Sequence, residues 1–160
     1  MKKCVFAGTF DPVTLGHTDI IERALSLFDE VHVLVAVNPD KKCFFGASER
    51  VELMEKASAK YNTEKTKVVC AAWDRPLFEY CLENGISHIV KGVRNTIDFE
   101  YEKTLALQTK VLSPSVETVL LYSNPALDHI SSSYVRGLIG YGMDVKGAVP
   151  EEIEEFLVKK

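Results

Sequence analysis

Residues 8–17, GTFDPVTLGH, combine residue types and a spacing suited to binding a phosphate group. Gly8 and Gly16 let the backbone come close to a ligand, and Thr9 adds a hydroxyl and a backbone N–H. His17 falls in the first turn of the helix expected to follow, where the helix N-terminus favours anions. The segment lacks the GK[ST] ending of a Walker loop and does not match GxGxxG. It therefore predicts a phosphate site, but not the phosphate site of a P-loop kinase or of a dinucleotide dehydrogenase.

Cationic side chains follow other apolar segments of the chain. Lys41 comes after the second predicted strand, and Lys91 and Arg94 come after the fourth. When one phosphate attacks another, several negative charges meet, so positioning and charge neutralisation matter more than a protein nucleophile. We therefore expect these three cations to converge with Thr9 and His17 on one rim, around a common hollow.

Three serines, Ser131, Ser132 and Ser133, precede a short helical pattern. Ser131 is expected to cap that helix, and hydroxyls with free backbone N–H groups at a helix start also form a nest for phosphate oxygens. Arg136, further along the same helix, is expected to reach the same phosphates. A serine-hydrolase site is not expected, because an incoming phosphate is itself the nucleophile.

Five apolar runs that alternate with helical patterns set the expected fold. The strands are predicted at residues 4–7, 31–37, 68–72, 88–90 and 116–122. The helices are predicted at residues 20–28, 51–57, 77–82, 98–111 and 131–139, and Pro150 opens the last one. Ser48 is expected to cap the second helix, and Asn84 and Gly85 are expected to end the third. Nearly all-apolar strands alternating with helices predict an α/β fold, a doubly wound five-stranded parallel sheet with helices on both faces.

The composition is ordinary for one globular domain spanning residues 1–160, with 46% hydrophobic and 26% charged residues. A formal net charge of −4 excludes a general nucleic-acid binder. No apolar run approaches the roughly 20 residues that cross a bilayer, and residues 8–12 interrupt any signal-peptide core, so we expect a cytoplasmic protein without a membrane partner.

The cysteines, Cys4, Cys43, Cys70 and Cys81, show neither a CxxC pair nor metal-finger spacing and are expected to be free thiols.

Thr14, Leu15, Gly16 and His17 resemble the [HT]xGH motif of the nucleotidylyltransferase superfamily. Further segments resemble motifs of one of its families, the bacterial phosphopantetheine adenylyltransferases: NPDKK at 38–42, KGVR at 91–94, DFEYE at 98–102, ISSSYVR at 130–136, and GMDV at 142–145 with VP at 149–150. The resemblance implies a Rossmann-like nucleotidylyltransferase fold and reversible transfer of AMP from ATP to 4′-phosphopantetheine by direct in-line attack. The products are dephospho-coenzyme A and pyrophosphate, in coenzyme A biosynthesis. The resemblance also implies Mg²⁺, a homohexamer and coenzyme A as a feedback ligand.

The same resemblance assigns roles to individual residues. As catalytic residues, His17 stabilises charge in the transition state, Thr9 bridges nucleotide and acceptor, and Lys41 holds the acceptor phosphate. The implied ATP-binding residues are Thr9, Phe10, His17, Gly92, Val93, Arg94, Glu102, Leu127, Asp128, His129, Ile130, Ser131, Ser132 and Ser133. The implied acceptor-binding residues are Thr9, Lys41, Leu77 and Lys91, and no residue is assigned as a metal ligand. Lys91 stands where the family commonly has arginine, and because lysine lacks a forked grip on phosphate, weaker acceptor binding is expected.

Two other functions stay open at this point. A sibling transferase would join the nucleotide to nicotinamide mononucleotide or glycerol phosphate, since the first loop is shared across the superfamily; the DFEYE segment and Leu77 argue against it. A catalytically silent module would bind a nucleotide or coenzyme A and do no chemistry. The joint presence of Thr9, His17, Lys41 and Arg94 argues against such a module, which needs no transition-state groups.

Overall fold

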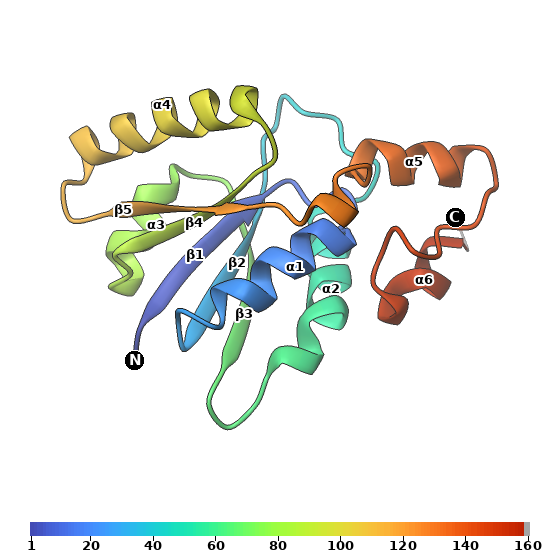
Figure 1. The fold of residues 1–160 in the computed structure, drawn as a ribbon, viewed down its shortest axis with the longest axis horizontal. Helices are drawn as coiled ribbons and strands as arrows, with labels where there is room; N and C mark the ends of the chain where they lie inside the picture. The colour runs from blue at the N-terminus through green and yellow to red at the C-terminus, as the bar shows by residue number, and fades with distance from the viewer. Residues whose placement is uncertain (159–160) are drawn as a thin grey trace.

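The computed structural model describes residues 1–158, which contain a five-stranded parallel sheet with helices packed against it (Figure 1). The strands are β1 (Lys3–Gly8), β2 (Glu30–Ala36), β3 (Lys67–Trp73), β4 (His88–Val93) and β5 (Glu117–Tyr122). The helices are α1 (Leu15–Ala24), α2 (Ala47–Ser58), α3 (Leu77–Asn84), α4 (Thr96–Leu112), α5 (Ser132–Gly140) and α6 (Glu151–Val158), with 3₁₀ turns at Ala59–Tyr61 and Pro125–Leu127. The predicted α/β fold with five parallel strands is confirmed.

The strand order is β3-β2-β1-β4-β5, so the chain winds outward from β1 in one direction and then continues from β4 in the other. All six residues of β1 pair with β2, but only Val5 and Phe6 pair with β4, opposite Ile89 and Val90. The ladder between β1 and β4 therefore ends at Phe6. A change of winding direction opens a crevice at the carboxyl ends of a parallel sheet, and this one lies between β1 and β4.

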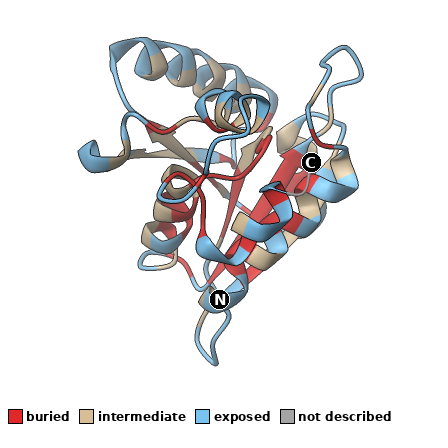
Figure 2. Cartoon of the chain, turned by 90° about the vertical axis from the view of Figure 1, so that its right-hand side faces the viewer, coloured by how far each residue is buried: buried red, intermediate tan, exposed pale blue. Residues whose placement is uncertain are grey.

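Alternate strand residues point to opposite faces of the sheet, and helices cover both faces. On one face, Cys4 and Phe6 pack in a large core with buried residues of α1, α2, α5 and α6. On the other face, Val5 packs with Tyr80 and Cys81 of α3. Figure 2 shows the buried residues along the strands and on the helix faces turned towards them. Within residues 1–158, no helix has the length and apolar character needed to cross a bilayer.

Strand β4 is longer than predicted. The apolar run ends at Val90, but β4 continues to Val93, so Lys91 lies inside the strand and only Arg94 follows it. The prediction that Lys91 comes after the strand is therefore wrong. The cause is β5, because Leu120 stands opposite Lys91 and the backbone ladder continues beyond the apolar run.

The start of α2 also differs from the prediction. The helix begins at Ala47, and Glu49 Oε2 accepts the Gly46 N–H at 2.8 Å. Ser48 is the second helical residue, so the predicted cap at Ser48 is wrong. The Glu49 side chain reaches back to the backbone N–H of Gly46, the residue before the helix, so the helix starts two residues earlier than a cap at Ser48 would allow.

The end of α1 lies before its predicted end at Phe28. The helix stops at Ala24, whose carbonyl oxygen accepts hydrogen bonds from the N–H groups of both Leu27 and Phe28. Phe28 is nevertheless buried in the core. The apolar spacing continues past the helix because the following turn returns this ring to the same core.

Gly85 ends α3 in the left-handed conformation, with φ of +63°, as its predicted role requires. A Cβ at Gly85 would meet no atom within 4 Å, so only the backbone conformation opposes a side chain there. We therefore expect Gly85→Ala to lower the free energy of unfolding by about 1 kcal/mol, measured by urea denaturation.

Gly137 provides the matched control for this substitution. It lies within α5, a Cβ there also meets open space, and its φ is not positive. Gly137→Ala should therefore raise the free energy of unfolding by about 0.5–1 kcal/mol, because alanine favours a helix. Equal effects of the two substitutions would contradict the assignment of strain to Gly85.

Candidate active site

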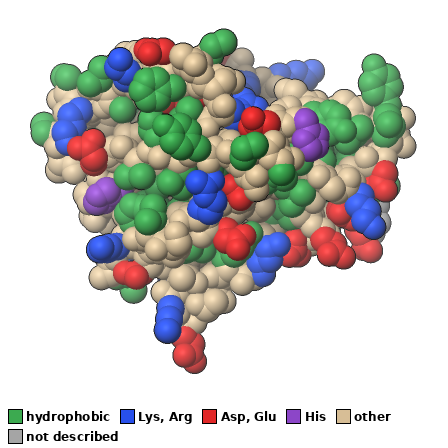
Figure 3. Space-filling model, in the orientation of Figure 1, with side chains coloured by type: hydrophobic (Ala, Val, Ile, Leu, Met, Phe, Trp, Pro, Cys, Tyr) green, Lys and Arg blue, Asp and Glu red, His purple; other side chains and the backbone are tan. Residues whose placement is uncertain are grey.

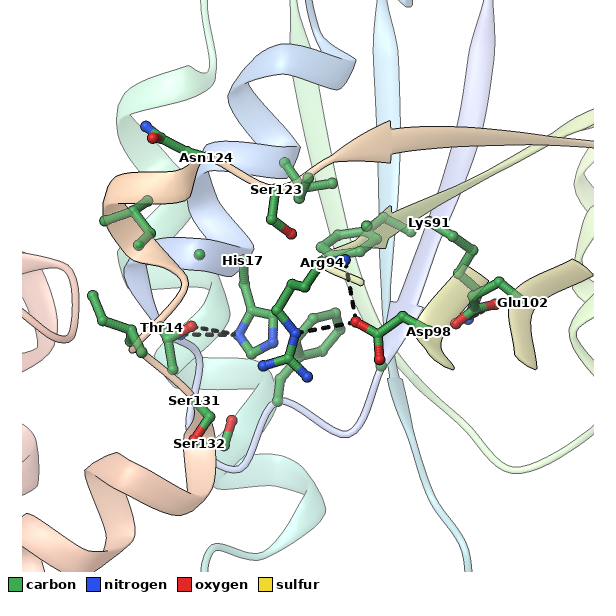
Figure 4. Close-up of a pocket in the computed structure, with 18 of the residues that line it drawn as sticks. Thr14, His17, Lys91, Arg94, Asp98, Glu102, Ser123, Asn124, Ser131 and Ser132 are labelled. Carbon is green, nitrogen blue, oxygen red and sulfur yellow. Dashed lines mark hydrogen bonds and ion pairs between the residues drawn. The ribbon is translucent and has the colours of Figure 1, made fainter. Parts of the chain in front are cut away.

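A cavity of about 400 Å³, the main cavity, lies where β1 and β4 part (Figure 4). Its walls come from the loop after β1, from α1, from β4 and α4, and from the chain that leads into α5. The residues that line it are Phe6, Ala7, Gly8, Phe10, Thr14, Gly16, His17, Ile20, Lys91, Gly92, Arg94, Asp98, Tyr101, Glu102, Ser123, Asn124, Leu127, Ile130, Ser131 and Ser132. The cavity is thus at the carboxyl-end crevice that the doubly wound sheet predicts.

A smaller hollow of about 220 Å³, the basic hollow, adjoins the main cavity. It is lined by Thr9, Asp11, Lys41, Lys42, Ser131, Ser132, Ser133 and Arg136. Lys41 Nζ donates a hydrogen bond of 3.1 Å to Thr9 Oγ1, which joins two residues 32 positions apart in the chain. Ser131 and Ser132 line both spaces, so these serines form the boundary between them.

A third space of about 360 Å³, the apolar hollow, lies between α3 and α4. It is lined by Pro76, Leu77, Phe78, Ile89, Lys91, Glu102, Leu105, Ala106, Gln108, Thr109, Leu112 and Thr118. Lys91 and Glu102 also line the main cavity, so they form its boundary with the apolar hollow. The main cavity therefore adjoins the basic hollow on one side and the apolar hollow on the other.

The His17 ring has a defined orientation and protonation state. The Thr14 backbone N–H donates to His17 Nδ1 at 3.0 Å, and Thr14 Oγ1 lies 3.2 Å from the same nitrogen. A backbone N–H only donates, so Nδ1 accepts and the proton of the neutral imidazole resides on Nε2. Phe10 packs edge-on against the ring, with centroids 4.9 Å apart. The loop and the start of α1 thus hold His17 as a hydrogen-bond donor within the main cavity.

Burial, and then the positive charge of Arg94, lower the pKa of His17 from 6.5 to about 4. Both effects disfavour the imidazolium, because a half-buried ring loses part of its solvation and a nearby cation repels a second positive charge. At neutral pH His17 is therefore an uncharged donor.

Acidic side chains of α4 hold two cationic side chains, Lys91 of β4 and Arg94 directly after this strand. Arg94 donates to Asp98 Oδ2 at 3.2 Å from both its backbone nitrogen and Nε, as Figure 4 shows. Lys91 Nζ lies 3.7 Å from Glu102 Oε2, which is buried and makes no hydrogen bond among the described residues. Glu102 Oε2 therefore keeps accepting capacity for a donor that enters the cavity.

Stability should depend on pH through His17. Between pH 4 and 6.5 the unfolded chain binds a proton at His17 that the folded protein does not. This contribution is complete above pH 6.5 and is lost as the pH falls towards 4, by up to about 3 kcal/mol. Urea denaturation at pH 4.5 and 7.5 measures the difference, which His17→Gln should reduce. An equal difference in the variant would contradict a ring that is held neutral at His17.

Most of the residues singled out from the sequence line these three spaces. The main cavity includes Phe10, His17, Lys91, Gly92, Arg94, Glu102, Leu127, Ile130, Ser131 and Ser132. The basic hollow contains Thr9, Lys41 and Ser133, and the apolar hollow contains Leu77. The expected single hollow is thus divided into adjoining ones. Val93 is buried and lines a separate shallow space with Tyr122, while Asp128 and His129 are exposed and line none of the three spaces.

Sequence reasoning did not identify Asp98, Asp11 or Arg50 as parts of the site. Asp98 holds Arg94, and the other two fix the loops that carry Thr9 and Lys41. The position of Asp98 four residues after Arg94, at a helix start, is a signal that could have indicated the pair. No local pattern indicates that Arg50, on a helix, is buried beneath two loops.

Comparison with known proteins assigns the chain to a class. A family model described as cytidylyltransferase-like matches residues 5–138. The fold resembles an NMN adenylyltransferase/ADP ribose pyrophosphatase from Francisella tularensis, with a TM-score of 0.74 and 16% identity over 99% of this chain and 49% of that one. It also resembles a nicotinic acid mononucleotide adenylyltransferase from Plasmodium falciparum, with a TM-score of 0.70 and 16% identity over 99% and 96% of the two chains. The chain belongs to the cytidylyltransferase-like family and is a nucleotidyltransferase.

Full-length relatives narrow the assignment. A protein named phosphopantetheine adenylyltransferase from Clostridium perfringens is 40% identical over 100% of this chain and 95% of its own length. One of the same name from Bifidobacterium animalis is 43% identical over 99% of this chain and 98% of its own length. Within its class, the chain therefore belongs to the phosphopantetheine adenylyltransferases, as the sequence motifs predict.

Proposed function

We propose that this enzyme transfers AMP from ATP to the 4′-phosphate of 4′-phosphopantetheine, giving dephospho-coenzyme A and pyrophosphate in coenzyme A biosynthesis. The observation that carries the proposal is the boundary at Ser131 and Ser132 between two spaces, one with His17 and Arg94 and the other with Thr9 and Lys41. Two phosphate groups bound on either side of this boundary would meet there. Adenylyl transfer in this pathway agrees with the names of the full-length relatives.

The proposed reaction is a direct displacement at the α-phosphorus of ATP. An oxygen of the acceptor phosphate forms a bond to the α-phosphorus, and the bond from this phosphorus to the pyrophosphate oxygen breaks, in line with the attack. No side chain has to act as a nucleophile. Because pyrophosphate can return through the same arrangement, we propose that the reaction is reversible.

The nucleotide is proposed to occupy the main cavity. Glu102 has an unused acceptor oxygen for a ribose or base donor, and Leu127 and Ile130 provide an apolar wall. The triphosphate would meet Arg94, the His17 Nε2–H and the N-terminus of α5, where Ser131 caps the helix by accepting the Tyr134 N–H at 3.0 Å. His17 would donate to the charge that grows in the transition state.

The acceptor is proposed to span the basic hollow and the apolar hollow. Its phosphate would bind Thr9 and Lys41, which already contact each other. Its pantetheine arm would run past Lys91 to the apolar wall that includes Leu77. Because Lys91 is a point charge already near Glu102, we propose that its hold on the acceptor is weaker than that of an arginine.

Mg²⁺ is proposed to enter as the magnesium complex of ATP. Residues 1–158 contain no group of three or more His, Cys, Asp or Glu placed to hold a metal ion, so the protein residues by themselves do not fit a resident site. Mg²⁺ commonly binds through phosphate oxygens and retains several waters.

A homohexamer in the cytoplasm, with coenzyme A as a feedback ligand, is proposed on the family relationship. The exposed apolar side chains of α4 support self-association, among them Ile97 and Val111, each 81% exposed. Figure 3 shows hydrophobic side chains gathered over the α4 end of the molecule. The four free thiols agree with a reducing compartment.

The acceptor is tested by measuring pyrophosphate release with ATP, Mg²⁺ and one acceptor at a time. We expect release with 4′-phosphopantetheine and little with nicotinamide mononucleotide or glycerol phosphate. Release with nicotinamide mononucleotide alone would reassign the acceptor to that of a sibling transferase. Nucleotide binding without release for every acceptor would favour the silent module.

A further inference from the structure

Arg50 connects the three backbone segments that carry the proposed acceptor-phosphate site. This α2 residue is only 3% exposed. Its Nη1 donates to the carbonyl oxygens of Thr9 at 2.7 Å and Ala36 at 2.9 Å, and its Nε donates to that of Phe45 at 3.2 Å. Thr9 belongs to the loop after β1, Ala36 is the last residue of β2, and Phe45 closes the loop that contains Lys41. One guanidinium therefore joins the two loops whose side chains meet at the Lys41–Thr9 hydrogen bond.

Asp11 fixes the same loop from the other side. It is 5% exposed, and its two carboxylate oxygens accept the N–H groups of Phe44 and Phe45 at 2.8 Å each. Arg136 of α5, which lines the basic hollow, donates to the Asp11 carbonyl oxygen at 2.7 Å. The loop at residues 37–46 is thus held at its start through Ala36 and at its end through Phe44 and Phe45, with Lys41 between.

Burying the Arg50 guanidinium costs free energy, and this cost indicates that the residue does more than fill space in the core. A guanidinium removed from water loses strong solvation, and apolar residues often replace buried ionic groups with no loss of stability. The donors of Arg50 are used on the carbonyl group of Thr9 and on those at the two ends of the loop that contains Lys41, where they hold the backbone of both segments and add positive charge. Phosphate transfer is sensitive to such distances, because a displacement of about 1 Å can cost 10²-fold in rate.

We propose that Arg50 is a positioning residue that sets the Thr9–Lys41 spacing for the acceptor phosphate, with Asp11 as its partner on the same loop. The inference rests on the proposed function. Arg50 does not contact the acceptor itself, and it acts through Thr9 and Lys41. Its loss should therefore weaken the binding of the acceptor more than that of ATP, whose proposed contacts lie mainly in the main cavity.

The test compares steady-state constants for Arg50→Lys and Arg50→Gln with those of wild type and of Leu53→Ala. Leu53 lies on the same helix and is 6% exposed, so its truncation destabilises α2 without touching either loop contact. We expect both Arg50 variants to raise the acceptor KM by about tenfold or more while the ATP KM changes less than about threefold. Leu53→Ala should lower the melting temperature about as much as the Arg50 substitutions do. It should leave the ratio of the acceptor KM to the ATP KM unchanged.

Three results would overturn the inference: an unchanged acceptor KM in folded Arg50 variants, equal increases in both KM values, or the same split in Leu53→Ala. If neither Arg50 variant folds, Asp11→Asn is measured in the same way, and an unchanged acceptor KM in it contradicts the inference. Wild type that fails to use 4′-phosphopantetheine would instead refute the proposed function, so the two failures are distinguishable.

Discussion

Replacing His17 with alanine is expected to lower kcat by about 10²-fold to 10³-fold, with the dissociation constant of ATP changed only a few-fold. Its Nδ1 accepts the Thr14 N–H, so the Nε2–H is the donor left for a ligand in the main cavity. A donor aimed at charge that develops only in the transition state affects kcat more than ground-state binding. Single-turnover rates and equilibrium titration with a non-hydrolysable ATP analogue measure the two quantities separately.

His88→Gln is the control for the His17 substitution. His88 begins β4, at the end of the strand away from the main cavity, and its ring packs against Phe28. This variant should keep the wild-type kcat. If His17→Ala retained the wild-type kcat, or if it lost ATP affinity in proportion to kcat, His17 would have no role specific to the transition state.

Replacing Lys41 with methionine is expected to lower kcat/KM for the acceptor by about 10²-fold. A charge-assisted hydrogen bond to phosphate contributes roughly 1.5–3 kcal/mol, and the ammonium also neutralises charge at the boundary where the two phosphates would meet. Methionine retains most of the length and the apolar stem of lysine. The change therefore isolates the charge and the hydrogen bond to Thr9.

Lys42→Met is the matched control, because Lys42 is adjacent, carries the same charge and lines the same hollow. We expect Lys42→Met to reduce kcat/KM by no more than about fivefold, as for a general contribution to the local field. Equal losses in the two variants would show that only net charge matters. Such a result would contradict a defined contact between Lys41 and the acceptor.

The sequence was sufficient for the order and type of the elements. Apolar runs such as residues 31–37 predict buried strands because a parallel sheet covered on both faces excludes water from both sides. Gly85 and Ser131 were correctly placed at helix ends. Gly85 adopts the left-handed conformation after α3, and the Ser131 hydroxyl accepts a backbone N–H at the start of α5. Lys91 was misplaced because the extension of β4 depends on pairing with β5, whose partner residue Leu120 lies 29 positions further along the chain.

The site was predictable where function depends on a continuous segment and not where it depends on tertiary contacts. Residues 8–17 identify His17, and its first-turn position follows from the helix pattern. The proton on Nε2 needs the observed Thr14–His17 contact. The division into adjoining spaces, and the burial of Arg50 beside Thr9, depend on how separate loops pack together.

The absence of a covalent step is the central claim of the proposed mechanism, and the stereochemistry at the α-phosphorus tests it most directly. ATP carrying sulfur at one prochiral oxygen of the α-phosphate is converted to the corresponding thio-derivative of dephospho-coenzyme A, and ³¹P NMR assigns its configuration. A single attack by the acceptor phosphate predicts inversion. Retention would require two successive displacements through an adenylylated side chain, and would contradict a site that works by holding two phosphates between Lys41, Thr9 and His17.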